Sequence, residues 1–359
     1  MTWLGRRAFL LAALSAIATL AAPVAGARTV TDSAGRTVTL PERVTKVMAA
    51  GPPASAVVYC LVPEAMVGWQ RRPRKEELPY LLPSTRDLPE LGRLTGRGDT
   101  ANVEMVLKAA PDIVVDFGAV RPTYISLADA VQSRTGIPYV LIDGRFEATP
   151  TSLRQLGGIL GVPERGEALA RYAEDLFKRI DGGLAGIAEA QRPRVYLARG
   201  SEGLETGMRG SINTEIIERA GGHNVAEAED VRRGIANVSP EQILLWKPEV
   251  VVTWDRTFFE KVTQRPDATW QSVPAVVNRR VHLAPTVPFG WIDGPPSVNR
   301  LIGLAWLANV LHGERFSFDI RRETHAFYKL FYHVDLGDAE LETLIAWADG
   351  KPPQTPARR

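Results

Sequence analysis

The sequence predicts an α/β fold of two lobes, in which mainly parallel sheets are covered by helices and one long backbone helix joins the lobes. Helical and strand-like segments alternate along most of the chain. Two predicted strands, DIVVDF at 112–117 and EVVVTW at 249–254, are apolar at nearly every position. Such runs are typical of parallel strands covered on both faces. Each strand follows a similar helix, so one unit occurs twice.

The repeated unit reads EMVLKAAPDIVV at 104–115 and EQILLWKPEVVV at 241–252. At an offset of 137 residues, Glu104 aligns with Glu241, and both copies continue with a proline, an acidic residue and three β-branched residues. A repeated helix and strand indicates two lobes of similar construction, each with its own sheet.

The predicted first lobe covers residues 28–162. It begins with a hairpin, Thr29–Asp32 and Arg36–Leu40, joined by the turn sequence Ser-Ala-Gly. Residues 70–99 form a long, charged, proline-broken loop, and loops of this length are usually functional or disordered. The other elements are expected, in chain order, at strand 44–49, helix 53–61, strand 66–69, helix 103–110, strand 112–117, helix 123–135, strand 139–142 and helix 150–160.

Residues 163–191 are predicted to form the connecting helix. Its apolar residues recur at helical spacings; they are Leu169, Tyr172, Ala173, Leu176, Ile180, Leu184 and Ile187. At ~1.5 Å per residue the helix would span about 40 Å. Gly182, Gly183 and Gly186 each cost about 1 kcal/mol relative to alanine, so this end is expected to bend or fray.

The predicted second lobe covers residues 192–348 and is followed by a flexible tail, 349–359. Its elements are expected at strand 194–198, glycine-rich loop 200–210, helix 213–220, helix 239–246, strand 249–253, strand 280–284 and helices 296–311, 319–332 and 338–348. The glycine-rich loop matches neither nucleotide-binding fingerprint.

Residues 1–27 are predicted to be a cleaved export signal. They combine the pair Arg6-Arg7, an apolar run and the small-residue pattern Ala25-Gly26-Ala27. The arginine pair is similar to a twin-arginine signal, although Sec export uses similar segments. A retained membrane anchor is less favoured, because an apolar run of about 15 residues is short for a bilayer core of ~30 Å. We therefore expect the mature chain in the periplasm.

The composition excludes some classes of protein. Removing 1–27 deletes two arginines and no acid, so the formal charge falls from +2 to neutral, and nucleic-acid binding is not expected. Cys60 is the only cysteine, so there is no internal disulfide. We expect a monomer without a cofactor.

Ligands of open parallel sheets bind beyond the carboxyl ends of the strands. That rule predicts a ligand site near Trp69, Asp116, Phe117, Gly118, Arg199, Trp254 and Asp255.

The whole mature chain resembles the periplasmic substrate-binding proteins with a helical backbone. The resemblance rests on TVTDSAGRTVTLPERVTKVMA (29–49), the repeated unit, the long helix, WQSVPAVVNRRVHLAP (270–285) and GPPSVNRLIGLAWLANVL (294–311). Those proteins serve ABC importers of iron–siderophore complexes, haem, cobalamin and metal ions. The resemblance implies capture of a metal chelate, most readily a ferric siderophore, and delivery to a permease and its ATPase.

The resemblance also implies a role for the repeated glutamates. In the family, one glutamate per lobe docks onto arginine pockets of the two permease subunits, and the matching positions are Glu104 and Glu241. Two related acids suit a partner with two similar subunits. The alternative is that a glutamate in a first turn only complements the helix dipole.

The ligand contacts are predicted from basic and aromatic residues near strand ends. Arginines after Trp69 and in the glycine-rich loop would attract an anionic chelate, unless Glu76 and Glu77 neutralise the first group. Aromatic rings could line a pocket, although tryptophans more often fill cores. The loop FGWIDGPPS should present a side chain to the cleft, unless its aspartate only caps a helix. The candidates are Trp69, Arg71, Arg72, Tyr124, Arg199, Trp254, Trp291 and Asp293.

Other functions are less favoured. The five histidines lack close ligand spacing, so a bare metal ion is not the expected ligand. The chain has no nucleophile elbow and no HExxH motif, so a hydrolase is not expected. An exported sensory module that binds no importer stays open as an alternative.

Overall fold

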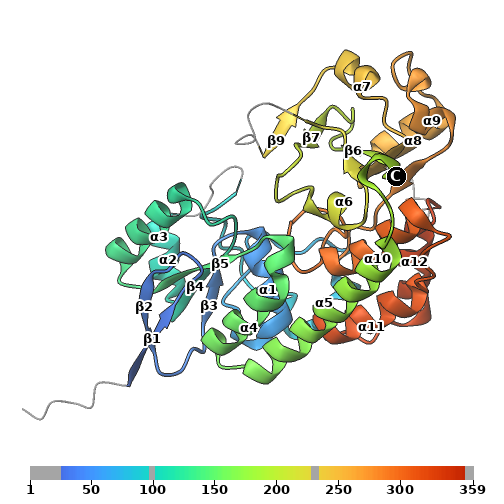
Figure 1. The fold of residues 1–359 in the computed structure, drawn as a ribbon. Coiled ribbons are helices and arrows are strands. Elements are labelled where there is room, and N and C mark those ends of the chain that lie inside the picture. Colours follow the sequence, from blue (N-terminus) through green and yellow to red (C-terminus); the bar gives the residue numbers. More distant parts are fainter. Residues whose placement is uncertain (1–25, 97–101, 228–233, 352–359) are drawn as a thin grey trace, which may run out of the picture.

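The computed structural model describes residues 26–96, 102–227 and 234–351, and it confirms the two-lobed α/β fold (Figure 1). The predicted signal, apart from its last two residues, lies outside these ranges, as does nearly all of the predicted tail. No helix within the described ranges is long and apolar enough to cross a membrane.

The N-lobe (26–162) is built on a three-stranded parallel sheet in the order β3-β4-β5. Alternate residues of β4 face opposite cores, because side chains alternate across a strand: Val114 packs with α2 and α3, whereas Val115 packs with α1 and α4. The elements are the hairpin β1 (Ala27–Thr31) and β2 (Thr37–Pro41), then β3 (Val47–Ala49), α1 (Pro52–Leu61), α2 (Val103–Ala109), β4 (Ile113–Gly118), α3 (Pro122–Thr135), β5 (Tyr139–Asp143) and α4 (Thr149–Leu160).

One predicted strand of this lobe is wrong. Residues 66–69 form only isolated bridges, Met66 with Val47 and Trp69 with Glu90. The two bridges are made to different partners, so no continuous ladder forms, and Met66 and Trp69 pack into the core without forming a strand.

The C-lobe contains a four-stranded parallel sheet in the order β11-β10-β6-β8 and a small antiparallel pair, β7 with β9. The helices α8 and α9 and the short strands β7, β8 and β9 were not predicted. The elements are β6 (Arg194–Ala198), β7 (Glu205–Gly207), α6 (Glu215–Arg219), β8 (His223–Asn224), β9 (Ile235–Asn237), α7 (Pro240–Trp246), β10 (Val250–Thr253), α8 (Arg256–Gln264), α9 (Pro274–Val277) and β11 (Val281–Leu283).

The sequence repeat is also a structural repeat. The side chain of Asn102 caps α2 by accepting from the N–H of Met105, and Ser239 caps α7 in the same way. Both helices end in a left-handed residue, Ala110 (φ 43°) and Lys247 (φ 44°), directly before the repeated proline. A left-handed cap turns the chain sharply, so each helix leads directly into an inner strand of its sheet, β4 or β10.

The connecting helix α5 runs from Pro163 to Leu184 and ends earlier than predicted. Gly183 lies so close to Phe316 that a Cβ there would sit 2.1 Å from the ring, and Gly186 has φ +78°. Gly183 thus allows Phe316 to pack closely against the helix, and Gly186 allows the chain to turn just after the helix ends.

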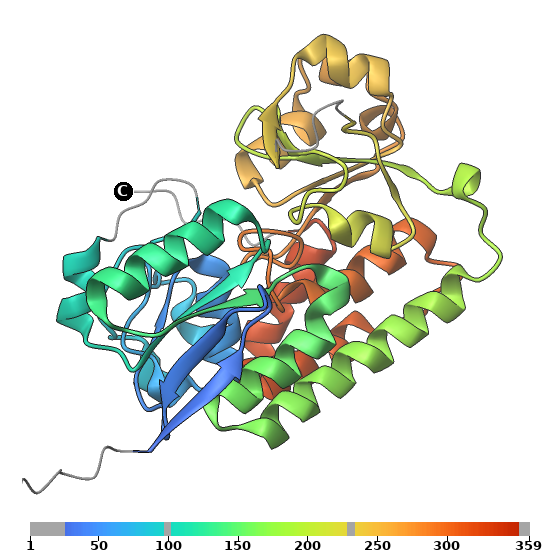
Figure 2. The same ribbon diagram turned by 60° about the vertical axis from the view of Figure 1, so that its left-hand side comes forward.

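The helices α10 (Arg300–His312), α11 (Ile320–Tyr332) and α12 (Asp338–Ala348) form a layer beside α5, drawn in orange and red in Figures 1 and 2. Helix α10 contacts α5 and α6, and α11 contacts α1. The Tyr59 hydroxyl donates to the carbonyl of Tyr332 at 2.8 Å. One hydrophobic core therefore continues from the N-lobe sheet through this layer to the second sheet.

Candidate functional site

A cavity of about 1630 Å³ lies between the two lobes and is the candidate binding site. Its walls include every residue that the strand-end rule predicted, from Asp116 in β4 to Asp255 after β10. The two central strands point their carboxyl ends at this space, because both sheets are parallel. Six of the eight predicted contact residues line the cavity: Trp69, Arg71, Tyr124, Arg199, Trp254 and Asp293.

Trp291 does not reach the cavity. It is 0% exposed, and its indole N–H donates to the Tyr328 hydroxyl at 3.3 Å. Helix α10 presses against its backbone, since a Cβ on Gly303 would lie 1.8 Å from the Trp291 carbonyl oxygen. The rigid loop thus buries its tryptophan and presents Asp293 to the cavity instead.

The arginine-rich loop is largely neutralised. Arg71 and Arg74 reach the buried carboxylate of Glu77 at 2.6 and 2.8 Å. Burial by itself would raise the pKa of Glu77, but the hydrogen bonds from these two arginines outweigh it and hold the pKa below its usual value. Arg72 is exposed and does not line the cavity. Of the two alternatives for this loop, the structure therefore favours neutralisation by its own glutamates over a free basic surface.

Trp69 contributes only an edge to the cavity. It is 3% exposed, its indole N–H donates to the carbonyl of Thr85 at 2.7 Å, and its ring packs on Tyr59 and Phe289. Its main role is in the core of the N-lobe.

Arg199, directly after β6, is a cation in the wall of the cavity. Its guanidinium stacks on the ring of Trp254, 5.1 Å from the centroid. Among the described atoms, its Nε and Nη1 are buried without a hydrogen-bond partner. The nearest carboxylates are Glu205 at 3.5 Å and Asp293 at 3.8 Å. Buried donors normally find an acceptor, so this geometry suits an anionic or carbonyl oxygen of a ligand.

Asp293 is held in place by the C-lobe. It accepts two hydrogen bonds from the Asn213 amide, at 3.0 and 3.1 Å, and one from the N–H of Gly294 at 2.7 Å. Asn213 was not predicted, since nothing in the sequence links it to a loop 80 residues later.

Asp116 lies in the N-lobe wall of the cavity. The hydroxyls of Tyr139 and Thr95 donate to its carboxylate at 3.2 and 3.3 Å. Burial raises its pKa to about 6, although these hydrogen bonds oppose the rise. Asp255, the acid after the matching strand β10 of the C-lobe, caps α8 by accepting from the N–H of Phe258 at 3.0 Å.

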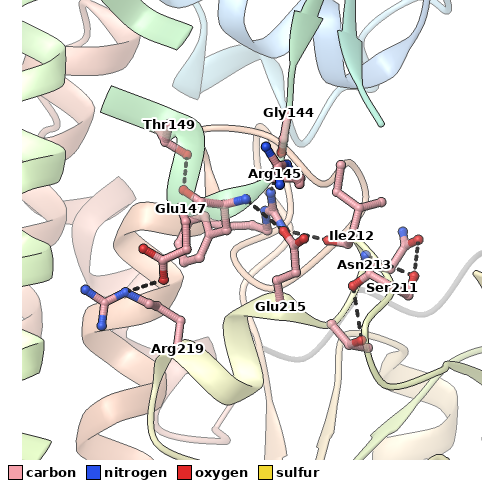
Figure 3. A network of polar contacts seen from close by, with 12 residues as sticks. Gly144, Arg145, Glu147, Thr149, Ser211, Ile212, Asn213, Glu215 and Arg219 are labelled. Atoms are coloured by element: carbon pink, nitrogen blue, oxygen red, sulfur yellow. Dashed lines mark hydrogen bonds and ion pairs between the residues drawn. The ribbon is translucent and has the colours of Figure 1, made fainter. Parts of the chain in front are cut away.

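A polar network joins the lobes at the base of the cleft (Figure 3). The fully buried Arg300 of α10 donates to the carbonyls of Ile212 at 2.6 Å and Gly144 at 3.1 Å. Burial lowers its pKa to about 10, against the opposing effect of Glu215 and Asp293. The sequence signal for it is a lone arginine in the apolar helix RLIGLAWLANVL.

The short helix α6 adds two further links between the lobes. Glu215 accepts from the backbone N–H of Phe146 at 2.7 Å. Arg219 forms ion pairs with Glu147 at 2.9 Å and with Asp181 of α5 at 2.5 Å. Figure 3 shows Glu215 and Arg219 pointing from α6 toward the segment around Arg145 and Glu147.

The repeated acids Glu104 and Glu241 are both exposed in the first turns of α2 and α7. Hydrogen bonds from its own backbone N–H and from Ser239 lower the pKa of Glu241, so it is ionised at neutral pH. Within the described part of the chain, no group of three or more His, Cys, Asp or Glu side chains could hold a metal ion.

Comparison with known proteins identifies a family. A model of the periplasmic binding protein family matches residues 65–288. The molybdate-binding protein MolA of Haemophilus influenzae is 27% identical over 336 residues, covering 86% of this chain and 91% of MolA. The vitamin B12-binding protein of Salmonella typhimurium is 28% identical over 153 residues, which cover 42% of this chain and 54% of that protein.

Solved structures share the whole architecture. An ABC transporter solute-binding protein from Sulfurospirillum deleyianum superposes with a TM-score of 0.80 at 30% identity, over 88% of this chain and 98% of that one. The structure of MolA with molybdate has a TM-score of 0.71 at 22% identity, over 86% and 99% of the chains, and supports the fold alone.

Proposed function

Since the chain belongs to the periplasmic binding protein family, we propose that it captures an anionic metal chelate, such as a ferric siderophore, in the cavity between its lobes. It is the periplasmic binding component of an ABC importer and not an enzyme. The observation that carries the choice of ligand is the Arg199 guanidinium in the cavity wall, whose Nε and Nη1 have no hydrogen bond among the described residues and only ion pairs with Glu205 at 3.5 Å and Asp293 at 3.8 Å.

The size of the cavity favours a chelate over a single ion. Small-molecule sites usually measure about 300–1000 Å³, and this cavity of about 1630 Å³ leaves room for a metal with its chelator. The described walls offer no cluster of metal-binding side chains, so the metal would arrive with its ligands already in place.

The charges in the walls limit the ligand further. The walls contain five arginines and seven carboxylates, and Arg71 and Arg74 are committed to Glu77. Such a wall does not suit a uniformly charged polyanion. It suits a ligand that places one anionic group at Arg199 and neutral or hydrogen-bonding groups elsewhere.

A molybdate-like oxyanion is the second candidate. The similarity to MolA covers nearly the whole of both chains and favours it. Four oxygens around one centre could accept from the Arg199 nitrogens, although they would fill only a small part of the cavity. Cobalamin and haem remain further alternatives of the same class.

Titration of the purified mature protein distinguishes these ligands. Tryptophan fluorescence and calorimetry would be recorded with carboxylate-type ferric siderophores, haem, cobalamin, molybdate, and simple iron, zinc and manganese salts. We expect saturable quenching with a ferric siderophore. Saturation by molybdate alone would establish the second candidate, and binding of free metal ions alone would refute both.

We also propose that delivery uses Glu104 and Glu241 as contacts to the permease. The support is their duplication, one exposed acid at the start of the same helix in each lobe. Because the polar network and the shared core join the lobes, we expect only modest closure around the ligand.

A further inference from the structure

Three large apolar side chains are exposed in the described part of the chain. Leu107 is 51% exposed, Leu245 is 71% exposed and Val277 is 64% exposed. Single apolar residues on a surface are ordinary. Two of these three, however, lie on the short repeated helices α2 and α7.

Each exposed leucine lies one turn after a repeated acid. Leu107 follows Glu104 by three positions and Leu245 follows Glu241 by four. Residues three or four apart are neighbours on one face of a helix. Only one residue of each helix is buried, Val106 in α2 and Ile243 in α7. Each lobe thus presents an acid and a leucine together on the solvent face of the same helix.

Duplication alone does not explain this arrangement. At the offset of the repeat, Leu107 corresponds to Leu244, which is half-buried against the C-lobe core, and Leu245 corresponds to Lys108. The exposed leucine therefore occupies a different repeat position in each helix. In both helices it is nevertheless a neighbour of the repeated glutamate.

We propose that Leu107 and Leu245 are apolar anchors for the importer's permease and act with the neighbouring glutamates. The partner would present, on each of two related subunits, an arginine beside an apolar contact. This inference rests on the proposed delivery function. Interfaces commonly combine a buried apolar anchor with a charge that sets orientation.

A permease is favoured over a second copy of this chain. The face offers one acid per lobe, so two copies in contact through it would bring carboxylates together, and like charges disfavour association. A partner built from two similar basic subunits complements both lobes at once.

The test measures binding of the ligand-free protein to its cognate permease–ATPase complex in nanodiscs. Leu107→Gln and Leu245→Gln keep side-chain length and helix propensity, and both positions are exposed, so folding should be unaffected. We expect each substitution to raise the Kd about tenfold, since a leucine contact is lost. Val277→Gln is the matched control for an exposed apolar residue outside the repeat and should leave the Kd unchanged.

The possible results distinguish failure of the leucine anchors from failure of the proposed delivery function. Leucine variants that bind like the wild type, while Glu104→Ala with Glu241→Ala loses binding, would overturn the anchors but keep the docking glutamates. An equal loss in Val277→Gln would also overturn them, because the effect would then be one of general surface hydrophobicity. If the unmodified protein does not bind the complex, the delivery function itself is wrong.

Discussion

The guanidinium of Arg300 lies 3.1 Å from the carbonyl oxygen of Gly144 and donates a hydrogen bond to it. The two residues are 156 positions apart in the chain. Arg300 comes from the C-terminal helical layer, Gly144 directly follows β5 of the N-lobe, and Ile212, the other carbonyl partner, belongs to the C-lobe. One buried cation thus connects the helical layer, the N-lobe and the C-lobe below the ligand cavity.

Arg300→Met should destabilise the fold. The change leaves the carbonyls of Gly144 and Ile212 without their donor and leaves Glu215 without the nearby charge. We expect the free energy of unfolding to fall by about 3–5 kcal/mol, as for other broken buried charge interactions. Urea denaturation measures it. Arg72→Met, at an exposed position, is the control and should change stability by less than about 0.5 kcal/mol.

Arg199→Ala should weaken ligand binding. Removing the guanidinium takes away charge-assisted donors worth about 1.5–3 kcal/mol, so the Kd of the bound chelate or oxyanion should rise roughly 10- to 100-fold. Calorimetry measures the change. Arg72→Ala, outside the cavity, should bind normally. Equal effects of both substitutions would show that only general charge matters.

Asp116→Asn should change how stability depends on pH. The pKa of Asp116 in the folded state, about 6, lies above its ordinary value of 3.8. Below pH 3.8 the carboxyl is protonated in both states. Between pH 3.8 and pH 6 the unfolded state has released this proton while the folded state still holds it, so stability falls across this interval, by about 3 kcal/mol at most, and changes no further above it.

The asparagine variant lacks this loss. Its stability relative to the wild type should therefore rise between about pH 4 and pH 6 and stay level above about pH 6.5, as measured by urea denaturation at each pH. Parallel profiles for the two proteins would mean that Asp116 is not protonated in the folded state in this range.

Replacing both docking acids should impair delivery of the ligand to the permease without changing the affinity for the ligand. Glu104→Ala with Glu241→Ala should abolish ligand uptake by cells, since each lobe loses the charge proposed to contact the permease. The ligand Kd should stay unchanged, because neither residue lines the cavity. Labelled-ligand uptake and calorimetry are the two measurements. Normal uptake by the double variant would remove the docking role.

Much of the fold was predictable because local pattern controls it. The long apolar strands, the helix caps Asn102 and Ser239 and the repeated prolines depend on neighbours within a few residues. The strand-end rule also located the cavity, because parallel sheets leave their carboxyl ends at one edge. Short strands such as β8 and β9 carry too few residues to show a pattern.

The sequence by itself determined that two similar lobes exist, where their central strands lie and which strand ends meet the cavity. Only the tertiary structure decided which side chains are free to act there. Arg71 is hydrogen-bonded to Glu77, while the Nε and Nη1 of Arg199 have no hydrogen bond among the described residues, and Trp291 is buried while Trp254 reaches the cavity. Residue type determines which hydrogen bonds and ion pairs a side chain can form. Packing between distant segments determines whether other groups of the protein already make those interactions.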